Sequence, residues 1–298
     1  MSPSFIGIGA QRAGTGWLYR NLERHPDLWM TPVKELHYFD SMHQPNSLVA
    51  RLRNPAWRRS VTLLMIRDCL PGSRGSIRWN FRYYFGRKND DWYSSLFAAA
   101  GCRTSGEITP AYSILDSDAV AHIRKILPDL RIIFLMRNPV HRVWSHAINR
   151  FVGVEKQRFE DIKEDQFINH IDNEGSQLRT DYVRTIQNWE AHFPATQIFY
   201  GFYDDIIQNP QSLIERVYAF LQVDPEIAHG DGSHGERVKP RMGSRYEMPL
   251  KVQLYAAQKY LGLLTELSSR FGGHTEAWLA AAQTLLEKGD NRSTRSTN

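Results

Sequence analysis

Cysteine is scarce in this sequence of 298 residues, which contains only Cys69 and Cys102. The two lie far apart and lack the spacing of zinc ligands, so neither a disulfide framework nor a zinc site is predicted. Apolar runs are also short, and none approaches the roughly 18 residues of a membrane span. The first apolar run has no basic segment before it and is interrupted by Gln11 and Arg12, which argues against a signal peptide. We therefore expect a cytoplasmic protein without an integral membrane segment.

Charge of one sign is not concentrated in any part of the chain. The formal net charge is +5 at pH 7, a mild excess that favours anionic ligands. Lysine and arginine are dispersed rather than gathered in blocks, so nucleic acid is not an expected partner. With 42% hydrophobic residues, the chain is long enough for one large α/β domain or two small ones.

The N-terminal stretch lacks the residues of a nucleotide-hydrolysing P-loop. An apolar strand over residues 5–8 runs into a glycine-rich turn, and a helix begins at about Gly14. Gly9 and Gly14 have the Walker A spacing, but Thr15 and Gly16 stand where that loop has Lys and then Ser or Thr. Nucleoside triphosphate hydrolysis is therefore disfavoured. The glycines and the first N–H groups of the helix still form a cradle for an anion.

Apolar strands alternate with amphipathic helices along the rest of the chain. Residues 131–136 form the clearest strand, a continuous apolar run typical of parallel strands that are buried on both faces. Two more strands are predicted over 103–108 and 197–201. Helices are predicted over about 116–127, 140–151, 181–192, 211–221, 249–271 and 275–287. The alternation indicates an α/β fold with a central parallel sheet and helices on both faces.

We expect a single domain over residues 1–287 and a disordered tail over 288–298. Residues 41–101 form an aromatic-rich insertion with short helices at about 47–53, 57–69 and 91–100. Its aromatic side chains either line an acceptor-side lid or pack a satellite core, and the sequence leaves both open. A short helix with a mobile loop is predicted over 154–178, and a loop over 230–243.

Three predicted strands end in polar stretches, at residues 9–16, 107–110 and 137–139. In open parallel sheets, ligands bind at the carboxyl ends of the strands. We therefore expect these stretches to meet at one edge of the sheet and to form the functional site.

Two of these stretches resemble motifs of sulfotransferases that use 3′-phosphoadenosine 5′-phosphosulfate (PAPS). Gln11-Arg-Ala-Gly-Thr-Gly-Trp17 resembles the loop for the 5′-phosphosulfate, and Arg137-Asn-Pro with Ser145 resembles the motif for the 3′-phosphate. Lys34-Glu-Leu-His-Tyr-Phe-Asp40 is most similar to the heparan-sulfate glucosamine 3-O-sulfotransferase branch and its bacterial relatives. The resemblance implies a P-loop-like three-layer sandwich, PAPS as donor, adenosine 3′,5′-bisphosphate as product, and no metal.

The resemblance also implies which residues bind the donor. Arg12 would stabilise the leaving phosphate, and Arg137 with Ser145 would bind the 3′-phosphate. Trp17 and Tyr182 match positions near the adenine, although both also fit a role in core packing. A loop with Arg241 and Gly243 would close over the 3′-phosphate, or would simply be a solvated basic loop. The implied cofactor-binding set is Arg12, Ala13, Gly14, Thr15, Gly16, Trp17, Arg137, Ser145, Tyr182, Arg241 and Gly243. Arg142, on the helix of Ser145, fits a structural ion pair.

The acceptor hydroxyl must lose a proton as it attacks, so the reaction needs a general base. Glu35 is our choice because it matches the family's glutamate in the motif, although a surface salt bridge with Lys34 would also explain it. Glu107, which ends a central strand, is the runner-up, and His37 is a third candidate or orients Glu35. Lys34, His37 and Glu107 are expected on the substrate side. Ile108 stands where related carbohydrate enzymes carry a lysine, which weakens the case for a heparan-like acceptor.

The sequence therefore predicts a metal-independent sulfotransferase that moves a sulfuryl group from PAPS to a hydroxyl. The acceptor is a carbohydrate, a phenolic compound or natural product, or a lipid-linked small molecule. A P-loop-like nucleotide kinase and a non-catalytic nucleotide-binding module are the alternatives. The sequence leaves open the order of substrate binding and the oligomeric state, including a homodimer.

Overall fold

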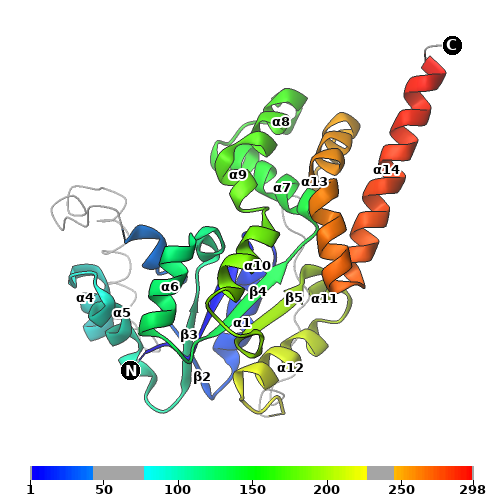
Figure 1. Cartoon of the computed structure of the whole chain (residues 1–298). Helices are drawn as coiled ribbons and strands as arrows, with labels where there is room; N and C mark the ends of the chain where they lie inside the picture. Colours follow the sequence, from blue (N-terminus) through cyan, green and yellow to red (C-terminus); the bar gives the residue numbers. More distant parts are fainter. Residues whose placement is uncertain (1, 43–76, 227–244, 297–298) are drawn as a thin grey trace.

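The computed structural model describes residues 2–42, 77–226 and 245–296, with a five-stranded sheet at its centre (Figure 1). All strand pairs are parallel, in the order β2-β3-β1-β4-β5. The strands are β1 (Phe5–Gly9), β2 (Leu28–Met30), β3 (Thr104–Ile108), β4 (Arg131–Met136) and β5 (Ile198–Phe202). The predicted α/β fold with a central parallel sheet is confirmed.

Strands β1 and β4 lie side by side at the centre of the sheet and are almost entirely buried. Every residue of β1 is buried, as is every residue of β4 after Arg131. A continuous apolar run is needed here because helices cover both faces. Strand β2 was not predicted, because its three residues are too few to show a period. Its pairing with β3, in which Leu28 lies opposite Thr104, defines it.

Helices cover both faces of the sheet (Figure 1). On one face lie α1 (Thr15–Arg24) and α12 (Pro210–Leu221), where the Tyr218 hydroxyl donates to the Asn21 carbonyl oxygen over 3.1 Å. On the other face α6 (Ser117–Ile126) packs against α10 (Tyr182–Glu190). Across the sheet, the chain moves in opposite directions from β1 to β2 and from β3 to β4. Since parallel crossovers are nearly always right-handed, these connections place α1 and α6 on opposite faces.

The remaining helices frame the carboxyl edge of the sheet and the far end of the chain. The α-helices are α4 (Ile77–Phe85), α5 (Asp90–Ser95), α7 (Pro139–Ile148), α8 (Glu164–Asp172), α9 (Glu174–Leu178), α11 (Tyr203–Gln208), α13 (Leu250–Phe271) and α14 (His274–Ser296). Short 3-10 helices span Phe39–Ser41, Leu96–Ala100, Pro110–Ile114, Phe159–Asp161 and Ala195–Gln197, and a π-helix spans Asn149–Val154. Helices α13 and α14 form a hairpin beside the sheet (Figure 1). None of the described helices combines the length and apolar character that crossing a membrane requires.

The structure also differs from the sequence prediction over residues 154–178 and in the C-terminal segment. Residues 154–178, expected to be a short helix and a mobile loop, contain the two helices α8 and α9. Helix α14 continues to Ser296, although a disordered tail was expected from Lys288. Gly289 explains part of this extension, because a Cβ atom built on it would lie 2.7 Å from Leu254 Cδ2 of α13. Because glycine has no side chain, α13 and α14 can approach each other closely at this position. In addition, a helix that is already formed extends at little cost.

The described part of the aromatic-rich insertion packs into the main core. Trp79, Trp92, Tyr93 and Phe97 are buried there with side chains from the sheet and its helices. The stacked rings of Tyr93 and Tyr38 have centroids 5.0 Å apart. Packing therefore accounts for these aromatic residues. The helices predicted over 47–53 and 57–69 and the loop predicted over 230–243 lie outside the described residues.

Candidate active site

The polar stretches that follow β1, β3 and β4 meet at one edge of the sheet. Strand β1 lies between the other two, so the three carboxyl ends are adjacent. The Arg12 side chain, after β1, reaches helix α7, which follows β4. The backbone N–H of Leu36 reaches Glu107 on β3. The predicted convergence is therefore present in the structure.

The glycine-rich turn between β1 and α1 has the geometry of an anion cradle. Gly14 is the N-cap of α1, its φ is 98°, and within the described chain no side chain caps this helix. A Cβ atom at Gly14 would lie 2.3 Å from Ile206 Cδ1, so both the backbone conformation and the packing require glycine. Ala13 and Thr15 on either side are buried. The helix therefore presents its positive end at the turn, an arrangement that attracts anions.

Arg12 connects this cradle with helix α7. Its backbone is left-handed, with φ of 73°. Nε donates to the Ser145 hydroxyl and Nη1 to the Asn149 side-chain oxygen, each over 3.1 Å. The residues predicted to bind the two ends of the donor are therefore in direct contact.

Arg137 lies at the end of β4, close to the turn. Its Nη1 donates to the Arg12 carbonyl oxygen over 3.2 Å, and its guanidinium lies 4.4 Å from the ring centre of Tyr203. Tyr203 was missed by the sequence analysis, although it directly follows β5 and so lies at another strand end. The Tyr182 hydroxyl donates to the Arg137 carbonyl oxygen over 2.9 Å, and the rest of Tyr182 is buried. Tyr182 therefore positions the Arg137 backbone.

Helix α7 itself carries a fully buried guanidinium, that of Arg142. Its Nη2 donates to the Thr180 hydroxyl over 2.6 Å and to the Ser176 carbonyl oxygen over 3.2 Å. These partners are neutral, so the predicted ion pair is not found among the described residues. Burial, followed by the charge of Arg142, lowers the pKa of His146 to about 3. The surroundings of Ser145 are therefore positive and favour an anionic ligand.

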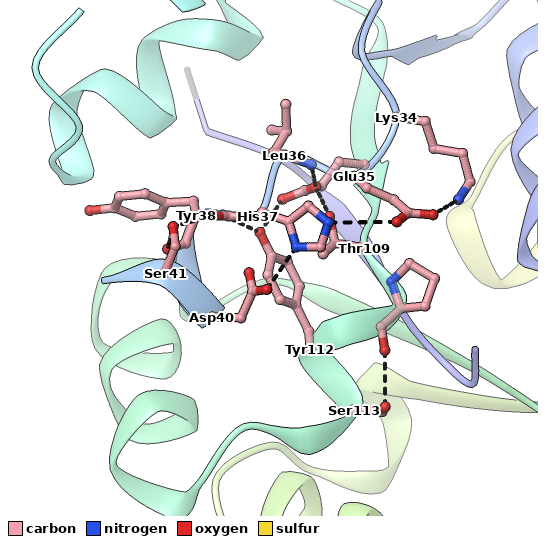
Figure 2. Close-up of polar contacts among 12 residues, drawn as sticks. Lys34, Glu35, Leu36, His37, Tyr38, Asp40, Ser41, Thr109, Tyr112 and Ser113 are labelled. Carbon is pink, nitrogen blue, oxygen red and sulfur yellow. Dashed lines mark hydrogen bonds and ion pairs between the residues drawn. The ribbon is translucent and has the colours of Figure 1, made fainter. Parts of the chain in front are cut away.

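The loop after β2 carries the second group of polar side chains (Figure 2). Glu35 pairs with Lys34, and Glu35 Oε2 lies 3.6 Å from His37 Nε2. On its other side, His37 Nδ1 lies 2.7 Å from Asp40 Oδ2. The ion pair with Lys34 is therefore present, but it belongs to a longer chain of alternating charges. Asp40 was not selected from the sequence, although it follows His37 by three residues.

These contacts determine the protonation states in the loop. The contact with His37, followed by that with Lys34, lowers the pKa of Glu35 to about 2 against the effect of burial. The contacts with Asp40 and then Glu35 raise the pKa of His37 to about 9. At neutral pH, Glu35 is therefore an ionised carboxylate between two cations. Its side chain is 39% exposed, so a substrate can reach it.

Glu35 and His37 both have a left-handed backbone, with φ of 66° and 50°. Such conformations cost about 1–3 kcal/mol each in residues other than glycine, and they persist where the surroundings hold them. Leu36, between the two, is buried in the core. The loop therefore keeps an unfavourable conformation in which two charged side chains meet above a buried leucine.

Three other predicted site residues, Trp17, Glu107 and Ser145, are buried. Trp17 is 1% exposed and lies within the main core, where packing accounts for it. Glu107 is 0% exposed, and burial raises its pKa against four hydrogen bonds that lower it. Glu107 is therefore not exposed to an acceptor as Glu35 is. Arg241 and Gly243 lie outside the described residues.

A cavity of about 730 Å³ opens beside Arg137, between α7 and the α13–α14 hairpin. Its wall is mostly apolar, with Trp144, Trp278 and Leu285, while Arg137 and Asn138 supply polar groups at one end. Its volume is within the range of pockets for small molecules and cofactors. A ligand bound by Arg137 would therefore have space for an uncharged portion nearby.

Comparisons with known proteins identify the family and the fold of this chain. The model of the Sulfotransferase family matches residues 3–226, a range that includes the turns of Arg12 and Arg137 and the loop of Glu35. The crystal structure of a sulfotransferase from Alicyclobacillus acidocaldarius is similar, with a TM-score of 0.63 and 19% identity over 93% of this chain and 99% of that chain. The sulfotransferase domain from the curacin biosynthetic pathway has a TM-score of 0.51 and 15% identity over 87% of this chain and 98% of that chain. For the sulfotransferase domain of the Synechococcus PCC 7002 olefin synthase, the TM-score is 0.50 and the identity 17% over 85% and 82% of the two chains.

Proposed function

Because this chain belongs to the sulfotransferase family, we propose that it transfers a sulfuryl group from PAPS to an acceptor hydroxyl, with Glu35 as the general base. The observation that carries the proposal is the pair of arginines at adjacent strand ends. Arg137 donates to the Arg12 backbone, and the Arg12 side chain donates to Ser145. One ligand can therefore contact both arginines, provided that it carries two separate anionic groups.

PAPS is a ligand of this kind, with a 5′-phosphosulfate and a 3′-phosphate. The N–H groups at the start of α1 and the Arg12 guanidinium would hold the phosphosulfate. Arg137 and the Ser145 hydroxyl would hold the 3′-phosphate, and the cavity beside Arg137 has room for part of the nucleoside. Bound there, PAPS would supply the sulfuryl group and leave as adenosine 3′,5′-bisphosphate.

The protein's own groups would stabilise charge and accept a proton. Arg12 and the N–H groups at the start of α1 would stabilise the negative charge that develops on the departing phosphate, because they lie at the turn where the phosphosulfate would bind. Glu35 is ionised and exposed, and it takes the proton of the attacking hydroxyl. Its contacts with His37 and then with Lys34 keep its pKa low, so Glu35 is a weak base while both cations are paired with it. Movement of Lys34 towards the anionic donor would raise the proton affinity of Glu35.

The acceptor is proposed as a hydroxyl compound, with carbohydrate as the first class to test. The similarity of residues 34–40 to the heparan-sulfate branch favours a sugar. Ile108 argues for a different sugar-binding surface, because it is 0% exposed and lies where carbohydrate enzymes carry a lysine. A Cβ atom on Gly7 would lie 2.9 Å from Ile108 Cγ1, so this position packs against β1. Phenolic and lipid-linked hydroxyls are therefore included in the screen.

Thermal unfolding with adenosine 3′,5′-bisphosphate tests the donor site. We expect the bisphosphate at 100 times its Kd to stabilise the protein by about 2.7 kcal/mol, and ATP with Mg²⁺ to give a much smaller shift. A nucleotide kinase would show the opposite order. If the bisphosphate gives no shift, the proposed function is overturned.

A screen of hydroxyl acceptors with labelled PAPS tests turnover. Transfer of label to at least one sugar, phenol or lipid-linked alcohol is expected. A protein that binds the bisphosphate but labels nothing across all three classes would instead be a non-catalytic nucleotide-binding module.

A further inference from the structure

We propose that Glu107 is a positioning residue, a buried carboxylate that holds the loop of residues 34–40 in the conformation that presents Glu35 and His37. The inference deepens the proposed function, since it takes the site of Glu35 as the site of reaction. Strand β3 carries Glu107, and the loop follows β2, the neighbouring strand. Glu107 Oε2 accepts the backbone N–H of Leu36 over 3.3 Å. One hydrogen bond therefore joins the carboxylate directly to the centre of the loop.

A second connection passes through Tyr112. Its hydroxyl donates to Glu107 Oε1 over 3.0 Å and accepts the backbone N–H of Tyr38 over 3.1 Å. Figure 2 shows Tyr112 and Thr109 on the side of the loop where the N–H groups of Leu36 and Tyr38 are bound. The two bonded N–H groups belong to the peptide planes that directly follow Glu35 and His37. Holding these planes in place restrains the backbone of Glu35 and His37, the two residues of this loop that have positive φ.

Each oxygen of the Glu107 carboxylate accepts two hydrogen bonds. Oε1 accepts from the hydroxyls of Tyr93 (2.8 Å) and Tyr112, and Oε2 accepts from the Thr109 hydroxyl (2.6 Å) and Leu36 N–H. Glutamine could not accept all four hydrogen bonds, because its amide nitrogen would face either the Leu36 N–H or the two phenols. Glu107, Tyr93 and Tyr112 are each 0% exposed. Glu107 therefore acts on the reaction through the loop and not by touching the acceptor.

Tyr93 and Tyr112 provide a matched pair of variants that tests this role of Glu107. Tyr93→Phe and Tyr112→Phe each remove one hydroxyl from Glu107 Oε1 and leave a fully buried ring. Only the Tyr112 hydroxyl also accepts from the loop. Tyr112→Phe leaves the hydrogen bond between the Tyr38 hydroxyl and Asp90 in place, so the loop stays attached to the core. Both variants are expected to fold, whereas Glu107→Gln brings donors face to face and risks unfolding.

The pKa of His37, measured by NMR titration of its imidazole, reports the loop geometry without any substrate. His37→Gln identifies the signal. Within the described part of the chain, the groups that face His37 are Asp40 and Glu35, and their contacts raise its pKa to about 9 in the native loop. We expect this value to fall towards the ordinary 6.5 in Tyr112→Phe and to stay near 9 in Tyr93→Phe. Equal shifts in both variants, or none in either, would overturn the proposal.

Turnover supplies the second readout, with labelled PAPS and an acceptor from the screen. In Tyr112→Phe we expect kcat to fall about 10- to 100-fold, the effect of a small misplacement of a reacting group, while the Kd of adenosine 3′,5′-bisphosphate stays unchanged. Tyr93→Phe should retain kcat. The proposed function and the positioning role of Glu107 can be overturned independently of each other. Absence of bisphosphate binding in the wild type overturns the proposed function, while the His37 titration still tests the positioning role.

Discussion

The two halves of the site are held in place in different ways. On the donor half, Arg137 directly follows β4 and Arg12 lies in the turn between β1 and α1, and the two are held by contacts within this half: Arg12 donates to Ser145, and Arg137 donates to the Arg12 carbonyl oxygen. On the acceptor half, Glu35 and His37 occupy a loop with an unfavourable backbone, held by side chains of β3 and the segment after it. Substitutions in the donor half should therefore weaken binding, whereas substitutions in the loop should slow turnover.

Glu35→Gln is the change with the largest expected effect. It keeps the shape of the side chain but removes the carboxylate that accepts the proton, so we expect kcat to fall by about 10²- to 10⁴-fold. Binding of adenosine 3′,5′-bisphosphate should be nearly unchanged, because Arg12 and Arg137 are intact. Steady-state kinetics and calorimetry on the same preparation measure the two effects.

Glu160→Gln is the matched control, because Glu160 is an exposed carboxylate whose side chain is 68% accessible and pairs with Arg158. It should leave both quantities at their wild-type values. Full activity of Glu35→Gln would show that the base has been assigned to the wrong residue.

Arg137→Ala, in contrast to Glu35→Gln, should weaken the binding of adenosine 3′,5′-bisphosphate. Loss of a charged hydrogen bond to the 3′-phosphate would weaken bisphosphate binding by about 2–3 kcal/mol, or about 30- to 150-fold in Kd. Titration calorimetry of the bisphosphate measures this change. Arg158→Ala removes the same charge from an exposed position and should leave the Kd unchanged. A loss of turnover with an unchanged Kd would contradict the division between the two halves.

Ser145→Ala should have a smaller effect in the same direction. The Ser145 hydroxyl is a neutral group, so its loss should weaken bisphosphate binding by about 1 kcal/mol. The variant also removes one acceptor from Arg12, which keeps its hydrogen bond to Asn149. If Ser145→Ala is as damaging as Arg137→Ala, the hydroxyl chiefly positions Arg12.

The same division explains how much could be predicted from the sequence. The stretches that contain Arg12 and Arg137 were found because they follow strands, and strand ends of a parallel sheet converge. The roles of these arginines, and the choice of Ser145, came from the resemblance to the family's motifs. The sequence also led to Glu35, but only through resemblance to a family, since the conformation of its loop depends on contacts with distant residues. Glu107 was taken for a second base because its position at a strand end is visible, whereas its four partners are not. Strand β2 was missed because its three residues are defined by pairing alone.

The smallest effect we predict is the pH dependence that His37 gives to the loop. Its folded pKa of about 9 lies above the ordinary 6.5, so its contribution to stability is complete below pH 6.5 and is lost as pH rises through about 9. Glu35 behaves in the opposite sense. Its contribution is present above pH 4.5 and is lost as pH falls through about 2.

We therefore expect kcat/KM to decline above about pH 9, as neutral His37 ceases to hold Glu35. The decline should be modest, because both side chains are partly exposed and solvent weakens their pairing. Profiles of kcat/KM against pH for the wild type and His37→Gln measure it, and the variant should lack this alkaline limb. An identical decline in the variant would show that a different group causes the loss of activity at alkaline pH. The geometry of the acceptor half would then depend on the buried hydrogen bonds of Glu107 rather than on the charge of His37.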